Sequence, residues 1–456
     1  MSSVVVVGGG IAGLTAGLAV LESGATVTVL EGTDRVGGKL RREIVAGHPV
    51  DVGAEAMLAV GDQGTGLATA VGLGEQLTTP ATSSAGVFSS GRLWPIPSPS
   101  LMGIPADPEQ AAGLLSEVEL DRLRSEVTTG AVDQDSSVAE FVSSRLGLAV
   151  LDKLVDPLVS GVYAGDPWQL SLRATAPQLW TVARSGERLL DASARLDRSG
   201  GSRARGAFAG LVGGMGTLPE AVANVLRDRG ARIVPDTIVR QLNRRTDGGW
   251  TVVSGPTTDP KTWAADAVIV AVPPSAAARL LSVNAPTAAS ALATMDSASM
   301  AVVTLAFPAQ RLGDLPGSGF LVPAVEQRPI KAATFSSAKW AWLAETAPEV
   351  AYVRTSVGRA GSAEELQRPD ASLIAASLAE LGHVLGRDVP PPIDVHVQRW
   401  GGALPQYAVG HVDRVATIRA SVAEAGGLAV CGAAYDGVGI PAVVGSARAA
   451  AAAVLA

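Results

Sequence analysis

Hydrophobic positions near the N-terminus follow a strand, turn and helix pattern. Residues 4–7 are consecutive valines, and an alanine- and leucine-rich stretch then ends at Ser23 and Gly24. A second β-branched run covers residues 26–30. Continuous apolar strands are typical of parallel sheets covered on both faces, and glycine commonly ends a helix. The pattern therefore predicts a βαβ unit.

Further strand patterns lie far from this unit. They occur at residues 231–239, 250–253 and 267–272, and again at 428–432 before an alanine-rich helix that ends the chain. We expect these segments to join the first unit in one layered α/β domain. Its predicted parts are 1–75, 208–274 and 395–456.

The rest of the chain has a different pattern. Residues 105–207 are predicted to form a helical domain, in which Ser137 and Glu140 have the spacing of a capping box. Thr217 and Glu220 repeat that spacing at the start of a later helix. Strand-like and helical patches mix in 76–104 and 275–394, which we expect to form a substrate-binding domain. The predicted fold class is therefore α/β and α+β, with a Rossmann-type domain built from discontinuous segments.

Composition narrows the possible functions. Of 456 residues 17% are charged and 47% hydrophobic, and the net charge is -7, which excludes a disordered chain and gives no general attraction to nucleic acid. One cysteine, Cys431, and four scattered histidines provide neither a disulfide nor a zinc site. No apolar run approaches the roughly 18 residues of a transmembrane helix. We therefore expect a cytoplasmic protein without a metal.

The strongest local signal is a glycine fingerprint between the first strand and helix. Gly8, Gly10 and Gly13 have GxGxxG spacing, and Glu31 ends the next strand. The glycines allow a tight turn, a close approach of pyrophosphate and close packing of helix on strand. The helix N-terminus presents free amides to the phosphates, and the acid accepts hydrogen bonds from ribose. This arrangement predicts dinucleotide binding.

The residues after Glu31 favour FAD over NAD. Arg35, the pair Gly37-Gly38 and Lys39 follow directly, and a further glycine turn covers residues 51–56. This order resembles the FAD-dependent amine oxidase and protoporphyrinogen oxidase superfamily. The resemblance implies an extended FAD, with residues 53–56 near the isoalloxazine ring.

Blocks spread over nearly the whole chain narrow the resemblance. Residues 432–441 (GAAYDGVGIP), 161–167 (GVYAGDP), 101–105 (LMGIP) and 404–411 (LPQYAVGH) look like the bacterial coproporphyrinogen III and protoporphyrinogen oxidases. Some members of that family hold a propionate with an arginine near a strand that matches residues 83–87. This chain has no arginine there.

The resemblance implies a set of FAD contacts at matching positions. They are Gly8, Gly9, Gly10, Ile11, Ala12, Gly13, Glu31, Gly32, Arg35, Gly38, Lys39, Gly53, Ala54, Glu55, Ala56, Val239, Trp400, Gly432, Val438, Gly439 and Ile440. Because residues 401–407 contain no cysteine, we expect FAD to be bound non-covalently. Candidates for the substrate pocket are Tyr163, Asp166, Arg173 and Tyr407.

The implied reaction is oxidation of a porphyrinogen in haem biosynthesis, with coproporphyrinogen III preferred over protoporphyrinogen IX. The flavin carries the redox chemistry, so we assign no catalytic side chain. The pair Gly214 and Gly216 does not continue to a third glycine, and without a second nucleotide site we expect molecular oxygen to be the acceptor and hydrogen peroxide the product. Transient contact with ferrochelatase and peripheral contact with a membrane stay open.

Other functions remain possible on the same fold. An amine oxidase should surround the flavin with aromatic residues, which make up only 4% of this chain. A carotenoid desaturase is a second enzymatic alternative. The non-catalytic alternative is a carrier like the prenyl-protein escort proteins, and such a protein would lack a flavin absorption band.

Overall fold

A five-stranded parallel sheet gathers strands from both ends and the middle of the chain. The computed structural model describes residues 2–82, 84–128, 130–198 and 208–456. In sheet order the strands are β12 (Arg232–Val234), β2 (Thr26–Leu30), β1 (Ser3–Val7), β16 (Ala267–Val270) and β22 (Leu428–Val430). The predicted fold class is thus confirmed, including its construction from discontinuous segments.

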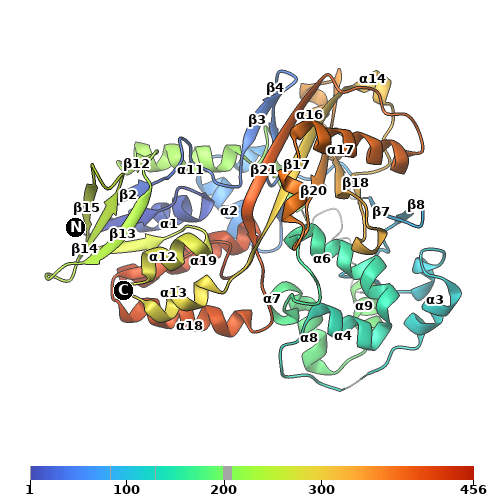
Figure 1. Cartoon of the computed structure of the whole chain (residues 1–456), viewed down its shortest axis with the longest axis horizontal. Coiled ribbons are helices and arrows are strands. Elements are labelled where there is room, and N and C mark those ends of the chain that lie inside the picture. The colour runs from blue at the N-terminus through green and yellow to red at the C-terminus, as the bar shows by residue number, and fades with distance from the viewer. Residues whose placement is uncertain (1, 83, 129, 199–207) are drawn as a thin grey trace.

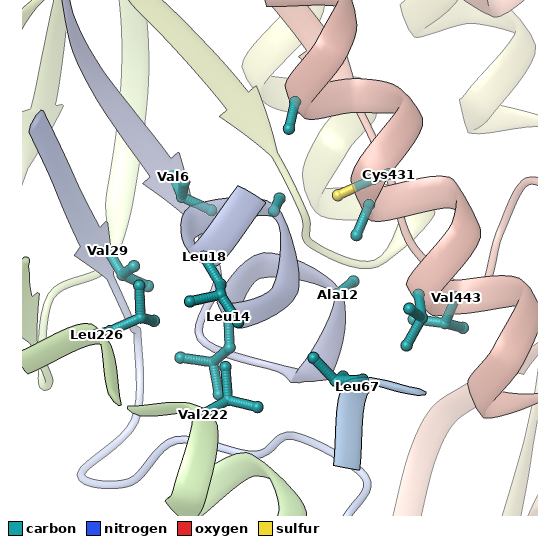
Figure 2. Packing of buried hydrophobic residues seen from close by; sticks show 14 of the residues in the cluster. Val6, Ala12, Leu14, Leu18, Val29, Leu67, Val222, Leu226, Cys431 and Val443 are labelled. Carbon is teal, nitrogen blue, oxygen red and sulfur yellow. The ribbon is translucent and has the colours of Figure 1, made fainter. Parts of the chain in front are cut away.

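Alternate valines of β1 face two separate apolar cores, because side chains alternate along a strand. Val4 and Val6 face a core formed with α1 (Ile11–Glu22), α11 (Thr217–Asp228) and α19 (Ile440–Leu455). Figure 2 shows Val222 of α11 beside Leu14 of α1, and Leu226 of α11 beside Val29 of β2. The other two strand valines face a core built by the elements α12 (Pro274–Leu281), α13 (Pro286–Ala293), α18 (His411–Glu424), β13 (Val239–Arg244), β14 (Trp250–Ser254) and β15 (Lys261–Ala265).

A seven-stranded sheet lies beside this layer (Figure 1). Its order is β21 (Asp394–Pro405), β17 (Ser297–Pro308), β20 (Val350–Val357), β19 (Ile330–Phe335), β18 (Gly319–Leu321), β7 (Ala85–Ser89) and β8 (Arg92–Pro95). Helix α17 (Asp370–Leu385) covers one face. Strand β21 pairs with β17 in this sheet, although the sequence grouped 395–456 with the nucleotide-binding segments. The domain boundaries stay a proposal.

Helices between residues 117 and 198 form a third layer, at the lower right of Figure 1. They are α3 (Glu117–Arg124), α4 (Val138–Leu146), α5 (Leu148–Val150), the π-helical turn η3 (Leu151–Val155), α6 (Asp156–Tyr163), α7 (Leu172–Thr175), α8 (Pro177–Ser185) and α9 (Leu189–Arg198). The capping box of Ser137 and Glu140 is confirmed. Residues 199–207 of the predicted helical domain lie outside the described ranges.

The second predicted capping box was wrong. Thr217 lies inside α11, whose N-cap is Gly216, and the threonine hydroxyl donates to the Gly214 carbonyl. The carboxylate of Asp51 instead accepts the amide hydrogens of Met215 and Gly216 at 2.7 and 2.9 Å. A residue distant in sequence therefore caps this helix.

Shorter elements complete the described chain. They are β3 (Arg42–Val45), β4 (His48–Asp51), β5 (Met57–Leu58), α2 (Gln63–Ala70), η1 (Gly74–Gln76), β6 (Leu77–Thr78), β9 (Ser100–Leu101), β10 (Ile104–Pro105), η2 (Pro108–Ala111), β11 (Phe208–Leu211), α14 (Ala309–Leu312), η4 (Ala324–Glu326), α15 (Ser336–Lys339), α16 (Ala341–Thr346) and η5 (Ala363–Gln367). Within the described ranges, no helix combines the length and apolar character that crossing a membrane requires.

Leu226→Ala tests the packing of α11 on α1. The Leu226 side chain is fully buried, so truncation removes apolar contacts and leaves a cavity. We expect the free energy of unfolding to fall by about 2–5 kcal/mol, measured by denaturant unfolding. The matched control is Leu148→Ala, which truncates a leucine that is 57% exposed and should change stability by less than about 0.5 kcal/mol. Equal losses in the two variants would contradict this packing.

Candidate functional site

The turn between β1 and α1 has room only for glycine at its tightest point. A Cβ atom added to Gly13 would lie 1.9 Å from the Gly8 carbonyl oxygen. The N-cap of α1 is Gly10, which provides no side-chain hydrogen bond, and the first helical turn has no acidic residue. The first amides of α1 therefore stay free and carry the positive end of the helix dipole, which suits a phosphate group.

The Glu31 carboxylate is fixed at the end of β2. Its Oε2 accepts from the Gly9 amide at 2.6 Å, and Oε1 accepts from the amide and hydroxyl of Thr33 at 2.9 and 2.8 Å. About four acceptor positions exist on a carboxylate, so about one stays free for a hydroxyl of a ligand. The carbonyls of Glu31 and Thr33 accept the amides of Thr237 and Asp236. This brings Gly32 beside the segment that leads into Val239, because a Cβ on Gly32 would lie 3.4 Å from Ile238 Cγ1. Thr33 belongs to no motif, so sequence reasoning did not find its contact with Glu31.

The loop after Glu31 lies against the glycine turn. Gly37 donates to the Gly9 carbonyl, and a Cβ on Gly38 would lie 3.2 Å from the Gly10 Cα. Arg35 donates to the carbonyls of Val36 and Gly38, so part of its guanidinium is already engaged by its own loop. Burial, followed by the charge of Arg41, lowers the Arg35 pKa.

Lys39 has no hydrogen-bond or ion-pair partner within the described residues. Its side chain is solvent-accessible, yet the surrounding protein lowers its pKa to about 8 through desolvation. The two observations agree for an ammonium group that has many protein atoms around it while water still reaches it. An anionic ligand would relieve the unfavourable desolvation.

Gly53 packs between Lys39 and Trp400. A Cβ on Gly53 would lie 1.9 Å from the Lys39 carbonyl oxygen and 3.2 Å from the indole Cζ2. The Trp400 Nε1 donates to the Val52 carbonyl at 3.1 Å. The structure thus brings together three predicted contact segments, and Ala54, the next residue of the turn, is exposed.

Glu55 belongs to a partly buried ion cluster that the sequence did not reveal. Its carboxylate accepts from Lys339 Nζ and Arg354 Nη1, each at 2.7 Å, and from Ser336 Oγ at 3.0 Å. Burial alone would raise its pKa, but the two cations outweigh burial and lower the pKa to about 2. Arg354 also donates to the Gly53 carbonyl. The cluster therefore fixes the turn 53–56 on β20 and α15, together with Ala56, which packs at the edge of the nearby apolar core.

The C-terminal glycine segment ends at a second helix without a side-chain cap. Gly439 is the N-cap of α19, and the first turn of that helix has no acidic residue. The Gly432 amide donates to Ser446 Oγ at 3.3 Å. Ile440 lies in the core beside α1, and Val438 packs against the helical layer. Amides 438–440 are thus available to a ligand that lies between the layers.

The four substrate-pocket candidates do not form one cluster. The rings of Tyr163 and Tyr407 lie 5.5 Å apart, but Tyr407 is fully buried and its hydroxyl donates to the Ala433 carbonyl. Arg173 forms a surface ion pair with Asp413 at 3.1 Å. The carboxylate of Asp166 accepts the Trp168 amide at 2.9 Å.

His411 stacks on Tyr407 with ring centroids 3.8 Å apart. Its Nε2 lies 3.3 Å from the Tyr435 carbonyl, and burial lowers the His411 pKa to about 4. A histidine that stays neutral in a packed core is a structural residue here. The Tyr407 hydroxyl is already engaged, whereas the His411 Nδ1 is buried without a hydrogen-bond partner among the described residues.

The residues present fit a dinucleotide cofactor. Two helix N-termini have no side-chain cap and no acidic residue in the first turn. Together with the glycines, which have no side chains, and with Lys39, which is unpaired among the described residues, they leave backbone amides and positive charge uncovered. A separate cavity of about 420 Å³ lies between the loop at 34–42 and α11. Its lining includes Arg35 but not the fingerprint glycines, Glu31 or the turn at 53–56, so it is distinct from most of the predicted contacts.

Comparisons with known proteins agree with this geometry. The family model described as flavin containing amine oxidoreductase matches residues 11–455. The coproporphyrinogen III oxidase of Mycobacterium tuberculosis H37Rv is 37% identical over 97% of this chain and 95% of its own length. That of Bacillus subtilis is 31% identical over 98% and 96%. A crystal structure from Exiguobacterium sp. 255-15, assigned as a protoporphyrinogen oxidase, has a TM-score of 0.87 and 32% identity, covering 99% of this chain and 98% of that one.

Gly13→Ala tests the fingerprint turn. The added methyl group collides with the Gly8 carbonyl, so the helix must shift away from the turn and its free amides are displaced. We expect at least about a tenfold loss of flavin affinity, the equivalent of about 1.4 kcal/mol, measured by flavin absorbance and titration. The matched control is Gly66→Ala on α2, where an added Cβ meets nothing within 4 Å. Full flavin content in both variants would disprove the role of Gly13.

Glu55→Gln tests the ion cluster. The change leaves two partly buried cations without a counter-charge, which we expect to lower stability at pH 7 by up to about 3–5 kcal/mol, the loss that breaking a fully buried pair causes. The Glu55 pKa is lowered from 4.5 to about 2, so its stabilising effect is present above about pH 4.5 and is lost as pH falls towards 2. The difference in melting temperature between wild type and variant should therefore narrow on acidification. A difference independent of pH would contradict the assignment of a charged Glu55.

Proposed function

We propose that this chain, which belongs to the flavin-containing amine oxidoreductase family and has FAD as its cofactor, oxidises coproporphyrinogen III to coproporphyrin III in haem biosynthesis. The observation that carries the proposal is similarity along 97% of the chain to proteins named coproporphyrinogen III oxidase. In the turn at 53–56, which the resemblance places near the isoalloxazine ring, the Glu55 carboxylate is engaged by Lys339 and Arg354, so we assign it a positioning role and leave the redox chemistry to the cofactor.

Bound FAD supplies the oxidising power by accepting hydride equivalents from the saturated bridges of the macrocycle. The amides of α1 and the Lys39 ammonium would hold the pyrophosphate, and Glu31 would accept from a ribose hydroxyl. The uncapped N-terminus of α19 offers a positive dipole to a developing negative charge. Glu55, through Arg354, holds the Gly53 turn in place.

Molecular oxygen is the proposed electron acceptor, with hydrogen peroxide as the product. The sequence contains one complete dinucleotide fingerprint, whereas Gly214 and Gly216 are not followed by the third glycine of a second one. We therefore infer no separate nicotinamide site that would take electrons from the reduced flavin. In the structure those glycines form the turn that Asp51 caps, which is a structural role. A cytoplasmic location and contact with ferrochelatase stay predictions.

Protoporphyrinogen IX is the second candidate substrate. The Exiguobacterium structure assigned as a protoporphyrinogen oxidase has a TM-score of 0.87 to this chain, and the two substrates share a macrocycle. They differ where propionate groups in one are vinyl groups in the other. The preference for coproporphyrinogen III rests on the names of the relatives with the greater identities.

Aerobic turnover of each substrate tests the proposed function. We expect porphyrin fluorescence to rise fastest with coproporphyrinogen III, above a no-enzyme control that corrects for autoxidation, together with hydrogen peroxide in a coupled assay. Under nitrogen, turnover should stop after one reduction of the bound flavin. The Gly13→Ala protein provides a control with impaired cofactor binding. Faster oxidation of a primary amine, or purified protein without a flavin band, would overturn the proposal.

A further inference from the structure

Buried charged atoms without partners gather where the helical layer meets the seven-stranded sheet. Lys331, on β19, is 4% exposed, and its Nζ has no hydrogen-bond partner in the part of the chain that the structure describes. Arg359, which follows β20, has a buried Nη1 without a partner. Asp156, the first residue of α6, is 5% exposed and has one unpartnered oxygen, Oδ1.

The backbone around these side chains is firmly connected. Helix α6 packs on β18 and β19, and Asp156 Oδ2 accepts the Ala324 amide at 3.1 Å. The Arg359 Nη2 donates to the Val322 carbonyl at 2.7 Å. One residue later, the Ala360 amide donates to the Ala164 carbonyl at 2.6 Å, at the C-terminal end of α6. The cations are therefore held at a fixed junction, with donor hydrogens to spare.

Such an arrangement is unfavourable for the protein alone. An ammonium group offers three donors, and burying it without an acceptor or counter-charge opposes folding. Burial, followed by the charge of Arg359, lowers the Lys331 pKa to about 7. Burial also lowers the Arg359 pKa, although Asp156 and Glu365 act against it. The charge of Asp156 acts on Arg359, but among the described residues no carboxylate forms an ion pair with Arg359 or accepts a hydrogen bond from Lys331 Nζ.

We propose that Lys331 and Arg359 form a binding site for a peripheral carboxylate of the porphyrinogen. The inference rests on the proposed function and names the group by which the site recognises its substrate. A propionate supplies two oxygens that could accept from Nζ and Nη1 together. Residues 83–87, which match the region where some members of the family are expected to place an arginine for this task, contain none in this chain, so the cations at the junction would take over that role from another part of the sheet.

The test compares Lys331→Met with Lys331→Arg and with a matched control, Lys261→Met, which makes the same exchange on the exposed strand β15. Each protein is prepared with FAD and its flavin content is measured first. We expect Lys331→Met to raise the KM for coproporphyrinogen III by about 10- to 100-fold, as for loss of a charged hydrogen bond. Lys331→Arg should recover part of that loss, and Lys261→Met should match wild type.

A binding measurement separates this site from the oxidation itself. Coproporphyrin III and its tetramethyl ester are titrated into the oxidised protein, with binding followed by porphyrin fluorescence. Wild type should prefer the free acid, because only the acid has carboxylates, and Lys331→Met should lose about tenfold or more of that preference. The melting temperature of Lys331→Met should stay the same or rise, because the variant removes an unpaired buried charge. A merely structural lysine would instead lower the melting temperature and leave the preference unchanged.

The outcomes distinguish the two proposals. If wild type oxidises coproporphyrinogen III and the KM of Lys331→Met is unchanged, the carboxylate site is wrong and the proposed function stands. If wild type neither oxidises a porphyrinogen nor binds a porphyrin, the proposed function fails, and the carboxylate site fails with it. If inorganic phosphate abolishes the preference for the free acid equally in wild type and in Lys331→Met, other cations recognise the carboxylates. That result also overturns the inference.

Discussion

The cofactor layer depends on two places where backbone touches backbone. At Gly13 and at Gly53 a Cβ atom would come within 1.9 Å of a carbonyl oxygen, that of Gly8 and that of Lys39 respectively. The first contact lets α1 begin directly against the strand turn, so its amides stay uncovered. The second places the turn at 53–56 against the loop that carries Lys39. Both contacts bring main-chain donors close to a ligand, because no side chain separates them from it.

Charge then connects this layer to the seven-stranded sheet. The Glu55 side chain extends from the turn at 53–56 and forms ion pairs with Lys339 of α15 and Arg354 of β20. Since Arg354 also donates to the Gly53 carbonyl, one guanidinium holds both the acid and the backbone of the turn. A flavin ring beside this turn would thus have its position set by the seven-stranded sheet. Removing any one member leaves the others buried without compensation, so the cluster acts as a unit.

Sequence patterns identified what is encoded locally. The fingerprint glycines, Glu31 and the capping box at Ser137 each depend on neighbours within a few dozen residues, and their spacing carries the signal. Contacts across the fold leave no such signal. Thr217 has the spacing of a cap, but Asp51 caps that helix from another element. The residues around Arg354 in the sequence do not indicate that it pairs with Glu55. Likewise, the residues around Tyr407 do not indicate that its hydroxyl donates to the Ala433 carbonyl.

Two pairs of cations at the seven-stranded sheet differ in whether the protein itself supplies their counter-charge. Lys339 and Arg354 share a carboxylate of the protein, and their charges stabilise the fold as it stands. Lys331 has no partner, and Arg359 is only partly satisfied by a carbonyl. Folding energy alone favours an apolar residue at such a position, because an unpaired buried charge opposes stability. Lys331 is explained if a ligand supplies the hydrogen-bond acceptor that the protein lacks. Binding of that ligand would then stabilise the folded protein and offset the unfavourable burial of the lysine charge.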